Sequence, residues 1–123
     1  MTTAIPGTLT PATDAEKLDV YRVALAAHAQ ATTILAGDHR ILRDQLERAS
    51  LSVILNTAEG AGRRSRKDKR RHYASARGSA MECAAAVDVI GIRNLAAPAD
   101  VAALRSLFVR AIQMLTKLDD ALA

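Results

Sequence analysis

The chain has 123 residues and a net charge of +4, half of its residues are apolar, and its aromatic residues are two tyrosines and one phenylalanine. A chain of this length forms one domain and can bury a core without disulfides or metal ions. Its single cysteine, Cys83, excludes an intramolecular disulfide and a thiolate metal cluster. Because the sequence also shows neither a signal peptide nor an uncharged apolar run of about 18 residues, we expect a cytoplasmic protein that does not enter a membrane.

The first predicted helix follows an N-terminal tail. Residues 1–12 hold two prolines and a glycine among threonines, and we predict that they form a flexible tail outside the fold. Thr13 followed by Glu16 fits a capping box, which predicts a helix over 14–36. Gly37 is expected to end this helix.

The second helix is predicted over about 41–59, with Gly60 and Gly62 ending it as C-terminal glycines do. Its second half is apolar nearly all round, apart from three polar residues on one line: Ser52, Asn56 and Glu59. Buried polar groups need partners, so we expect this line to join Ser79 and Glu82 of the next helix in a structural polar network. The alternative, a catalytic carboxylate site, is supported by no nucleophile and base pair.

The third helix is predicted over about 65–93, with Ser65 and Asp68 in a capping arrangement at its start. One apolar stripe is assigned to the core: Tyr73, Ala76, Ala80, Cys83, Val87 and Ile90. A second, roughly opposite stripe is assigned to an interface between subunits: Ala74, Gly78, Met81, Ala85 and Val89. A helix with two apolar faces is buried on two sides, and a domain this small offers a core to only one of them.

The segment 63–72 accounts for the net positive charge of the chain. It contains seven Lys or Arg residues and one Asp, a charge of +6, whereas the rest of the chain sums to −2. Cations are unfavourable in the first turns of a helix, and broken local rules tend to mark function. We therefore predict a polyanion-binding surface formed by these cations: Arg63, Arg64, Arg66, Lys67, Lys69, Arg70, Arg71 and Arg77. The alternative is a solvated face that serves only solubility.

The fourth helix is predicted over about 98–121, with Pro98 in its first turn. Apolar residues from Val101 to Leu122 alternate spacings of three and four, which is typical of bundle packing. β-Branched residues form no sustained alternating run, so no strand is expected. The pattern predicts an all-α four-helix bundle over 13–123, and the two-faced third helix predicts a homo-oligomer.

The sequence offers no pattern of an enzyme, a metal site or a cofactor site. His28, His39 and His72 are scattered without the spacing of metal ligands. His28 is expected to be a hydrogen-bonded core histidine, and Cys83 an inert buried thiol. The glycines of 60–62 follow a helix rather than a strand, which excludes a dinucleotide-binding loop. We therefore predict a non-enzymatic protein with no metal and no cofactor.

Two stretches of the chain resemble a known family. The first contains Ser50 or Ser52 and then 56–63, read Asn-Thr-Ala-Glu-Gly-Ala-Gly-Arg, and the second contains 78–82, read Gly-Ser-Ala-Met-Glu. With the opening 18–21, they resemble the four-helix-bundle proteins related to the 23S rRNA intervening-sequence proteins, a family that includes accessory proteins of diversity-generating retroelements. The resemblance covers roughly 18–121.

The resemblance implies an antiparallel four-helix bundle that assembles into a ring, a homopentamer. It also implies a positively charged surface proposed to bind nucleic acid, and no enzymatic activity. The sequence departs from the family pattern before Tyr73, where the usual aromatic residue of the basic segment is missing and further Arg and Lys residues stand instead.

Nucleic-acid binding, to RNA or DNA, is the function that the sequence favours. Because the chain lacks tryptophan and Tyr73 belongs to the core stripe, Lys and Arg would contact phosphates without base stacking. The alternative is a scaffold or accessory protein whose basic segment docks an acidic protein partner, such as a reverse transcriptase-like enzyme. A membrane-surface helix is disfavoured, since the segment lacks Trp, Phe or Leu residues to enter lipid.

Overall fold

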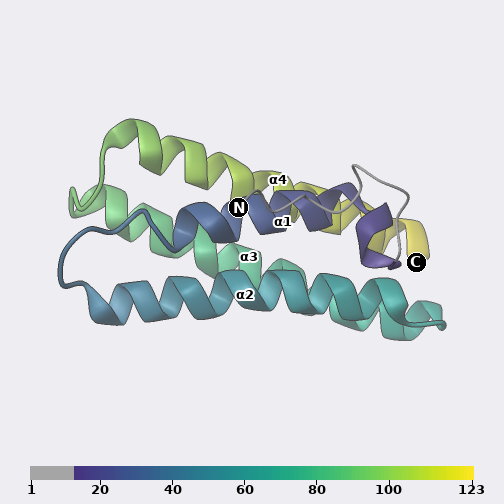
Figure 1. Cartoon of the computed structure of the whole chain (residues 1–123). Helices are drawn as coiled ribbons and strands as arrows, with labels where there is room; N and C mark the ends of the chain where they lie inside the picture. Colours follow the sequence, from purple (N-terminus) through teal and green to yellow (C-terminus); the bar gives the residue numbers. More distant parts are fainter. Residues whose placement is uncertain (1–12) are drawn as a thin grey trace.

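Four α-helices form the protein in the computed structural model, which describes residues 13–123 (Figure 1). A short 3₁₀ helix, η1 (Ala15–Lys17), leads into α1 (Asp19–Ala31), α2 (Arg40–Gly62), α3 (Arg66–Ile92) and α4 (Pro98–Leu122). The part of the chain that the structure describes contains no strand, which confirms the all-α prediction. The tail predicted over 1–12 lies outside the described residues.

The helices pack as a four-helix bundle in which α3 lies between α2 and α4. Along the contact of α2 with α3, residue numbers rise on one helix as they fall on the other: Ser52 meets Ser79, and Glu59 meets His72. Hydrogen bonds between α3 and α4 follow the same rule. Short connections therefore bring the end of each of these helices next to the start of the following one.

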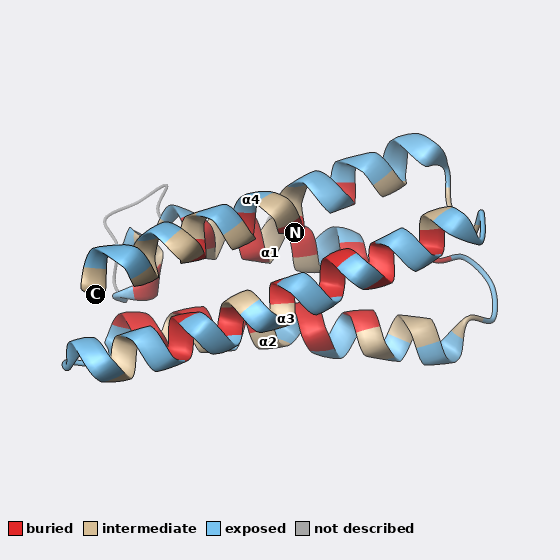
Figure 2. Ribbon diagram, turned by 180° about the vertical axis from the view of Figure 1, so that it is seen from behind, coloured by how far each residue is buried: buried red, intermediate tan, exposed pale blue. Residues whose placement is uncertain are grey.

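The core is built on one stripe of α3, as the sequence predicted. All six residues of the predicted core stripe, from Tyr73 to Ile90, are at most 4% exposed. The largest side chains packed around them come from the other long helices: Leu46, Val53, Leu104, Phe108 and Leu115. Figure 2 shows the buried residues on the sides of the helices that face one another. Apolar burial of this kind is the main stabilising term for a domain.

The first helix is shorter than the sequence predicts. A helix over 14–36 was expected, but Leu18 has extended backbone angles (φ −99°, ψ 127°) and separates η1 from α1. At the other end, the hydroxyls of Thr32 and Thr33 donate to carbonyl oxygens of the last turn, which offers the backbone an alternative to the helix. Gly37 lies in the connection, with a φ of +83° that favours glycine.

The predicted capping box at the first helix is also wrong. The residue that caps η1 is Asp14, one position beyond Thr13, and its side chain makes no capping hydrogen bond. In α1 itself, small residues face the core, with Val20, Ala24 and Ala27 at most 2% exposed. Their size allows α1 to lie close against α2 and α4.

The second helix runs past Gly60, the first of the two glycines that were expected to end it. Gly60 lies inside α2, and Gly62 is its last residue. A Cβ atom on Gly60 would lie 2.6 Å from Cε1 of Tyr73, whereas one on Gly62 would meet nothing within 4 Å. Gly60 is therefore required by the close approach of α3, and the chain leaves the helix at Arg63, which is extended (φ −77°, ψ 152°).

Both ends of α3 have defined caps. The backbone N–H of Asp68 donates to Oγ of Ser65 at 3.0 Å, which confirms the predicted N-cap. At the C-terminal end, Asn94 has a φ of 54°, and the N–H of Leu95 donates to the carbonyl of Ile90 at 3.1 Å. This is the Schellman arrangement, and it turns the chain into α4.

Candidate nucleic-acid interface

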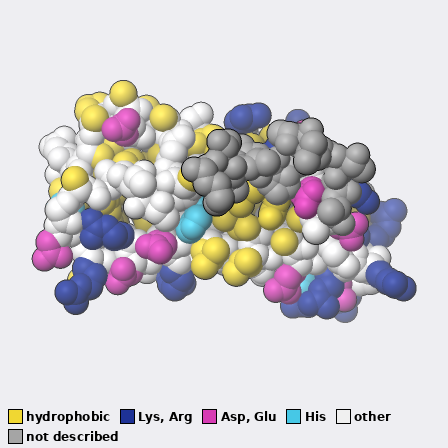
Figure 3. Space-filling view, viewed as in Figure 1, with side chains coloured by type: hydrophobic (Ala, Val, Ile, Leu, Met, Phe, Trp, Pro, Cys, Tyr) yellow, Lys and Arg dark blue, Asp and Glu magenta, His cyan; other side chains and the backbone are white. Residues whose placement is uncertain are grey.

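The basic segment lies at the end of the bundle where α2 passes into α3. It begins directly after α2 and covers the connection around Arg64 and the first two turns of α3. Figure 3 shows Lys and Arg side chains gathered at this end together with acidic ones. Because both signs of charge are present, the contacts of each cation decide which positive charges are available to a ligand.

Lys69 is occupied by the end of α2. Its Nζ donates to the carbonyl oxygens of Gly60 at 3.2 Å and Ala61 at 2.9 Å. The last carbonyls of a helix have no partner within the helix and carry partial negative charge, so an ammonium group there is favourable. Lys69 therefore ties the start of α3 to the end of α2. Its positive charge is used within the fold, although the sequence predicted it as a binding residue.

Arg70 and Arg77 are directed toward α4. The guanidinium of Arg70 binds Asp119, with Nε 2.8 Å from Oδ1 and Nη2 3.4 Å from Oδ2. This hydrogen-bonded charge pair holds the pKa of the Asp119 carboxyl below its ordinary value and raises that of Arg70. Nε of Arg77 donates to Oγ1 of Thr116 at 2.8 Å. Both arginines thus serve the contact between α3 and α4.

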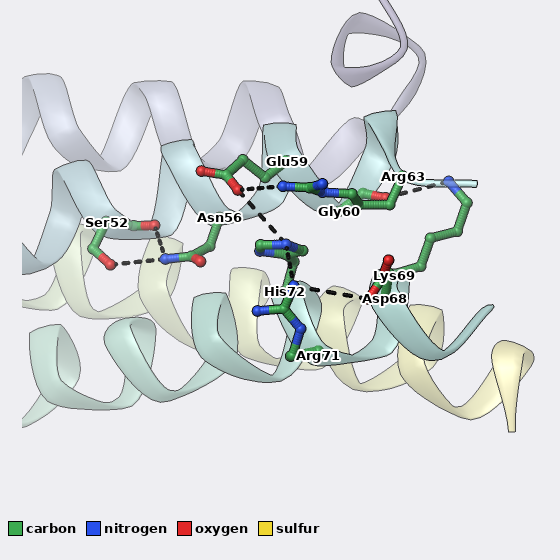
Figure 4. Close-up of polar contacts among 9 residues, drawn as sticks. All are labelled: Ser52, Asn56, Glu59, Gly60, Arg63, Asp68, Lys69, Arg71 and His72. Carbon is green, nitrogen blue, oxygen red and sulfur yellow. Dashed lines mark hydrogen bonds and ion pairs between the residues drawn. The ribbon is translucent and has the colours of Figure 1, made fainter. Parts of the chain in front are cut away.

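Arg63 and Arg71 each contact a carboxylate close by in sequence. Nη2 of Arg63 lies 3.3 Å from Oε2 of Glu59, and Nη2 of Arg71 lies 3.8 Å from Oδ1 of Asp68. His72, only 7% exposed, lies between these two pairs (Figure 4). All four charged side chains of these pairs are about half exposed, so solvent weakens both ion pairs.

Three of the eight predicted binding cations have no partner among the residues that the structure describes. They are exposed and lie around the connection between α2 and α3: Arg64, Arg66 and Lys67. Together they carry a charge of +3 within four residues. The sequence predicted eight binding cations, and the structure separates these three from five that have contacts within the chain.

The predicted polar network forms only in part. Oγ of Ser52 lies 2.8 Å from Oγ of Ser79, and Nδ2 of Asn56 donates to both the carbonyl and the Oγ of Ser52 at 3.0 Å. These three residues join α2 to α3. Glu59 and Glu82, which were expected in the same network, have no hydrogen bond to them among the described residues.

The two glutamates lie at the two ends of this contact instead. Glu82 accepts a hydrogen bond from Gln45 and lies 3.5 Å from Nη2 of Arg48. Glu59 lies 3.6 Å from Nε2 of His72 and also binds Arg63. Neither Gln45 nor Arg48 was expected in this network, although both lie at helical spacing on the line of Ser52.

The second apolar stripe of α3 faces away from the core. All five residues of the predicted subunit interface are exposed in the single chain, with Met81 at 48% and Val89 at 41%. A Cβ atom on Gly78 would meet nothing within 4 Å. On the neighbouring helix α2, Leu51 and Leu55 are exposed at 44% and 53%. Exposed apolar side chains along one side of a helix are typical of contact sites.

Over 13–123, no group of three His, Cys, Asp or Glu residues is placed to hold a metal ion. The pKa of the buried Cys83 thiol is raised to about 12, first by desolvation and then by the charge of Glu82, so it is not a nucleophile at neutral pH. His28 Nδ1 lies 2.7 Å from Oγ of Ser50, which confirms a hydrogen-bonded histidine. None of the helices in this range has the length and apolarity to cross a bilayer.

Comparison with known proteins assigns the chain to a family. No curated protein matches the sequence. The model of one family, the 23S rRNA-intervening sequence protein family, matches residues 16–117, which include all four helices except the last residues of α4. The match contains the polar contact of α2 with α3, the basic connection and the exposed stripe of α3. The chain therefore belongs to the 23S rRNA-intervening sequence protein family.

Proposed function

We propose that this protein is a non-enzymatic, cytoplasmic, nucleic-acid-binding subunit of a ring-shaped homo-oligomer of antiparallel four-helix bundles. The observation that carries the proposal is the trio Arg64, Arg66 and Lys67, exposed and unpaired within 13–123 at one end of the bundle. Unpaired cations repel one another and gain nothing from the fold, whereas a polyanion would neutralise all three. The family is named for an intervening sequence of 23S rRNA, so RNA is the first ligand to test.

Phosphates are the part of the nucleic acid that this surface suits. Tyr73, the aromatic residue nearest in sequence, is only 4% exposed and is packed against Gly60, so it cannot stack on a base. Arg and Lys side chains would contact phosphate oxygens, which position a ligand without reading its sequence. We therefore expect weak sequence preference and strong dependence on salt.

Assembly of several subunits would bring together several copies of this basic surface, each of which binds weakly alone. Apolar residues on the outer side of α3, among them Met81 and Val89, are available for packing against a second copy. A ring, five-fold as the family resemblance implies, would place one basic connection from each subunit on the same assembly. Simultaneous contacts of several subunits with one strand raise the affinity without any new contact type.

The test compares two variants that lose the same charge. In the first, Arg64, Arg66 and Lys67 are changed to Gln. In the second, three cations elsewhere that are also exposed and unpaired within the described chain are changed to Gln: Arg40, Arg93 and Arg110. Binding of labelled RNA and DNA is measured by fluorescence anisotropy across a salt series, with light scattering to check assembly and circular dichroism to check folding.

Wild type and the second variant should bind with equal, steep salt slopes. The first variant should lose about 0.9 in the slope of log affinity against log salt for each phosphate contact removed on duplex DNA, and about 0.7 on single strands. If both variants lose the same affinity and salt slope, net charge alone explains binding, and the assignment of the site to these three residues is wrong. Absence of binding by wild type at low salt would overturn nucleic-acid binding, and an acidic protein partner would then be the ligand to seek.

A further inference from the structure

His72 is a buried histidine beside the basic connection, in contact with Arg71 and with Glu59, the partner of Arg63. His72 is 7% exposed, and its Nε2 lies 3.2 Å from Nη2 of Arg71 and 3.6 Å from Oε2 of Glu59. An arginine can only donate hydrogen bonds, so Nε2 accepts from Arg71. The contact therefore requires a neutral imidazole that carries its proton on Nδ1.

Protonation of this ring reverses the role of Nε2. A protonated imidazole donates from both nitrogens and cannot accept from Arg71. The two positive charges then repel each other, while Oε2 of Glu59 is placed to receive the new N–H. That same carboxylate oxygen lies 3.3 Å from Nη2 of Arg63, so His72 and Arg63 compete for it.

We propose that His72 is a proton-controlled switch that holds Arg71 when neutral and, when protonated, takes Glu59, releases Arg63 to solvent and leaves Arg71 with only its weak ion pair to Asp68. Imidazole is the side chain that changes charge between about pH 5 and 8. The charged groups that face the switch are Glu59 and Arg63 from the end of α2, and Asp68 and Arg71 from the start of α3. Figure 4 shows the four of them around the ring.

The switch would tune the proposed binding surface, and this part of the inference rests on the proposed function. The released arginines flank the unpaired trio in sequence: Arg63 precedes it, and Arg71 follows it. Each cation that gains a phosphate contact steepens the salt slope by about 0.7 on a single strand and raises affinity roughly fivefold at 0.1 M salt. Affinity should therefore rise as the pH falls from 7.5 to 5.5.

The first experiment needs no ligand. In the full chain labelled with ¹⁵N, NMR of the imidazole nitrogens reports the tautomer of each histidine. At pH 7.5, His72 should carry its proton on Nδ1, and on acidification the side-chain signals of Arg71 and Arg63 should shift with the same midpoint as the ring. An Nε2–H tautomer at pH 7.5, or arginine signals that do not follow the ring, would overturn the switch even if nucleic acid binds.

The second experiment measures affinity with a labelled oligouridylate, since uracil gains no proton in this pH range. Wild type should bind roughly five- to twentyfold more tightly at pH 5.5 than at pH 7.5 at constant ionic strength. His72→Gln, which keeps an acceptor for Arg71 but cannot take a proton, should bind alike at both. His39→Gln, at the opposite end of α2, should keep the wild-type pH response.

The outcomes separate the two proposals. A pH response that persists in His72→Gln, or that disappears in His39→Gln, would overturn the role of His72. If wild type binds no oligonucleotide at either pH while the NMR signals exchange as described, nucleic-acid binding fails and the exchange of partners at His72 stands. Circular dichroism at both pH values verifies that the variants are folded, and the NMR measurement on wild type does not depend on any variant.

Discussion

The aromatic ring of Tyr73 on α3 lies against Gly60 of α2, at a position where α2 has no side chain. A Cβ atom placed on Gly60 would lie 2.6 Å from Cε1 and 2.8 Å from Cδ1 of this ring. Tyr73 is 4% exposed, and the ring has little room to move away. This contact sets the distance between the two helices just behind the basic connection.

Gly60→Ala should destabilise the protein. Alanine is the better helix former by up to about 1 kcal/mol, but overpacking against a buried ring costs about 1–3 kcal/mol. We expect a net loss of about 1 kcal/mol in the free energy of unfolding, measured by urea denaturation. Gly62→Ala is the matched control in open space and should be neutral or stabilising by about 0.5 kcal/mol. Equal effects in both variants would show that the ring does not restrict this position.

The pair of Arg70 and Asp119 predicts a pH-dependent stability difference. Because the folded protein lowers the pKa of Asp119 below its ordinary value of 3.8, the pair contributes stability above that value and loses it as the pH falls through the lowered pKa. Asp119→Asn should therefore be less stable than wild type at pH 7, and the difference should vanish at strongly acidic pH. Asp120→Asn, which lacks this hydrogen bond, should show a smaller difference. A gap between Asp119→Asn and wild type that does not change with pH would contradict the charge pair.

Cys83 should be unreactive in the folded protein. Its thiol is 0% exposed, and its pKa of about 12 leaves it protonated at pH 8. A disulfide reagent should modify it only as fast as the protein opens, and denaturant should make the reaction complete. Ser106→Cys, exposed on α4, is the control and should react at once at the new thiol. Rapid stoichiometric modification of wild type without denaturant would disprove the burial of the thiol.

Acidic substitutions on the outer side of α3 test the proposed assembly. Met81→Glu and Val89→Glu change side chains that are 48% and 41% exposed in the single chain, so each should alter the stability of an isolated chain by at most about 0.5 kcal/mol. Light scattering should show a smaller assembly for both variants. Ile41→Glu, at a side chain 88% exposed, should assemble as wild type does. An unchanged mass in all three would place the subunit contact elsewhere.

The parts of the fold that the sequence predicted are those in which local and tertiary preferences agree. The core stripe of α3 repeats at helical spacing over most of that helix, and every predicted member is buried. Ser65 caps α3 as expected, because a cap depends only on residues within one turn. The same agreement explains the correct assignment of four helices.

The errors occur where distant parts of the chain decide a local feature. Glycine is typical of a helix end, so Gly60 was predicted to end α2. In the structure it packs against the ring of Tyr73, a contact between helices that the local sequence does not reveal. The start of α1 depends on the extended backbone of Leu18, whose side chain packs against the core. Likewise Arg70 is paired by Asp119, 49 residues further along, so the sequence alone could not separate it from the unpaired cations.

The contact of Lys69 with the end of α2 divides the basic segment by its tolerance to substitution. Arg64, Arg66 and Lys67 could be exchanged for any polar residue without cost to the fold, whereas Lys69 holds two helix carbonyls that no short or acidic side chain could satisfy. Selection for folding alone would therefore preserve Lys69 and let the other three drift. If positive charge is retained at those three positions among related sequences, selection for ligand binding is the cause, because the fold does not require it.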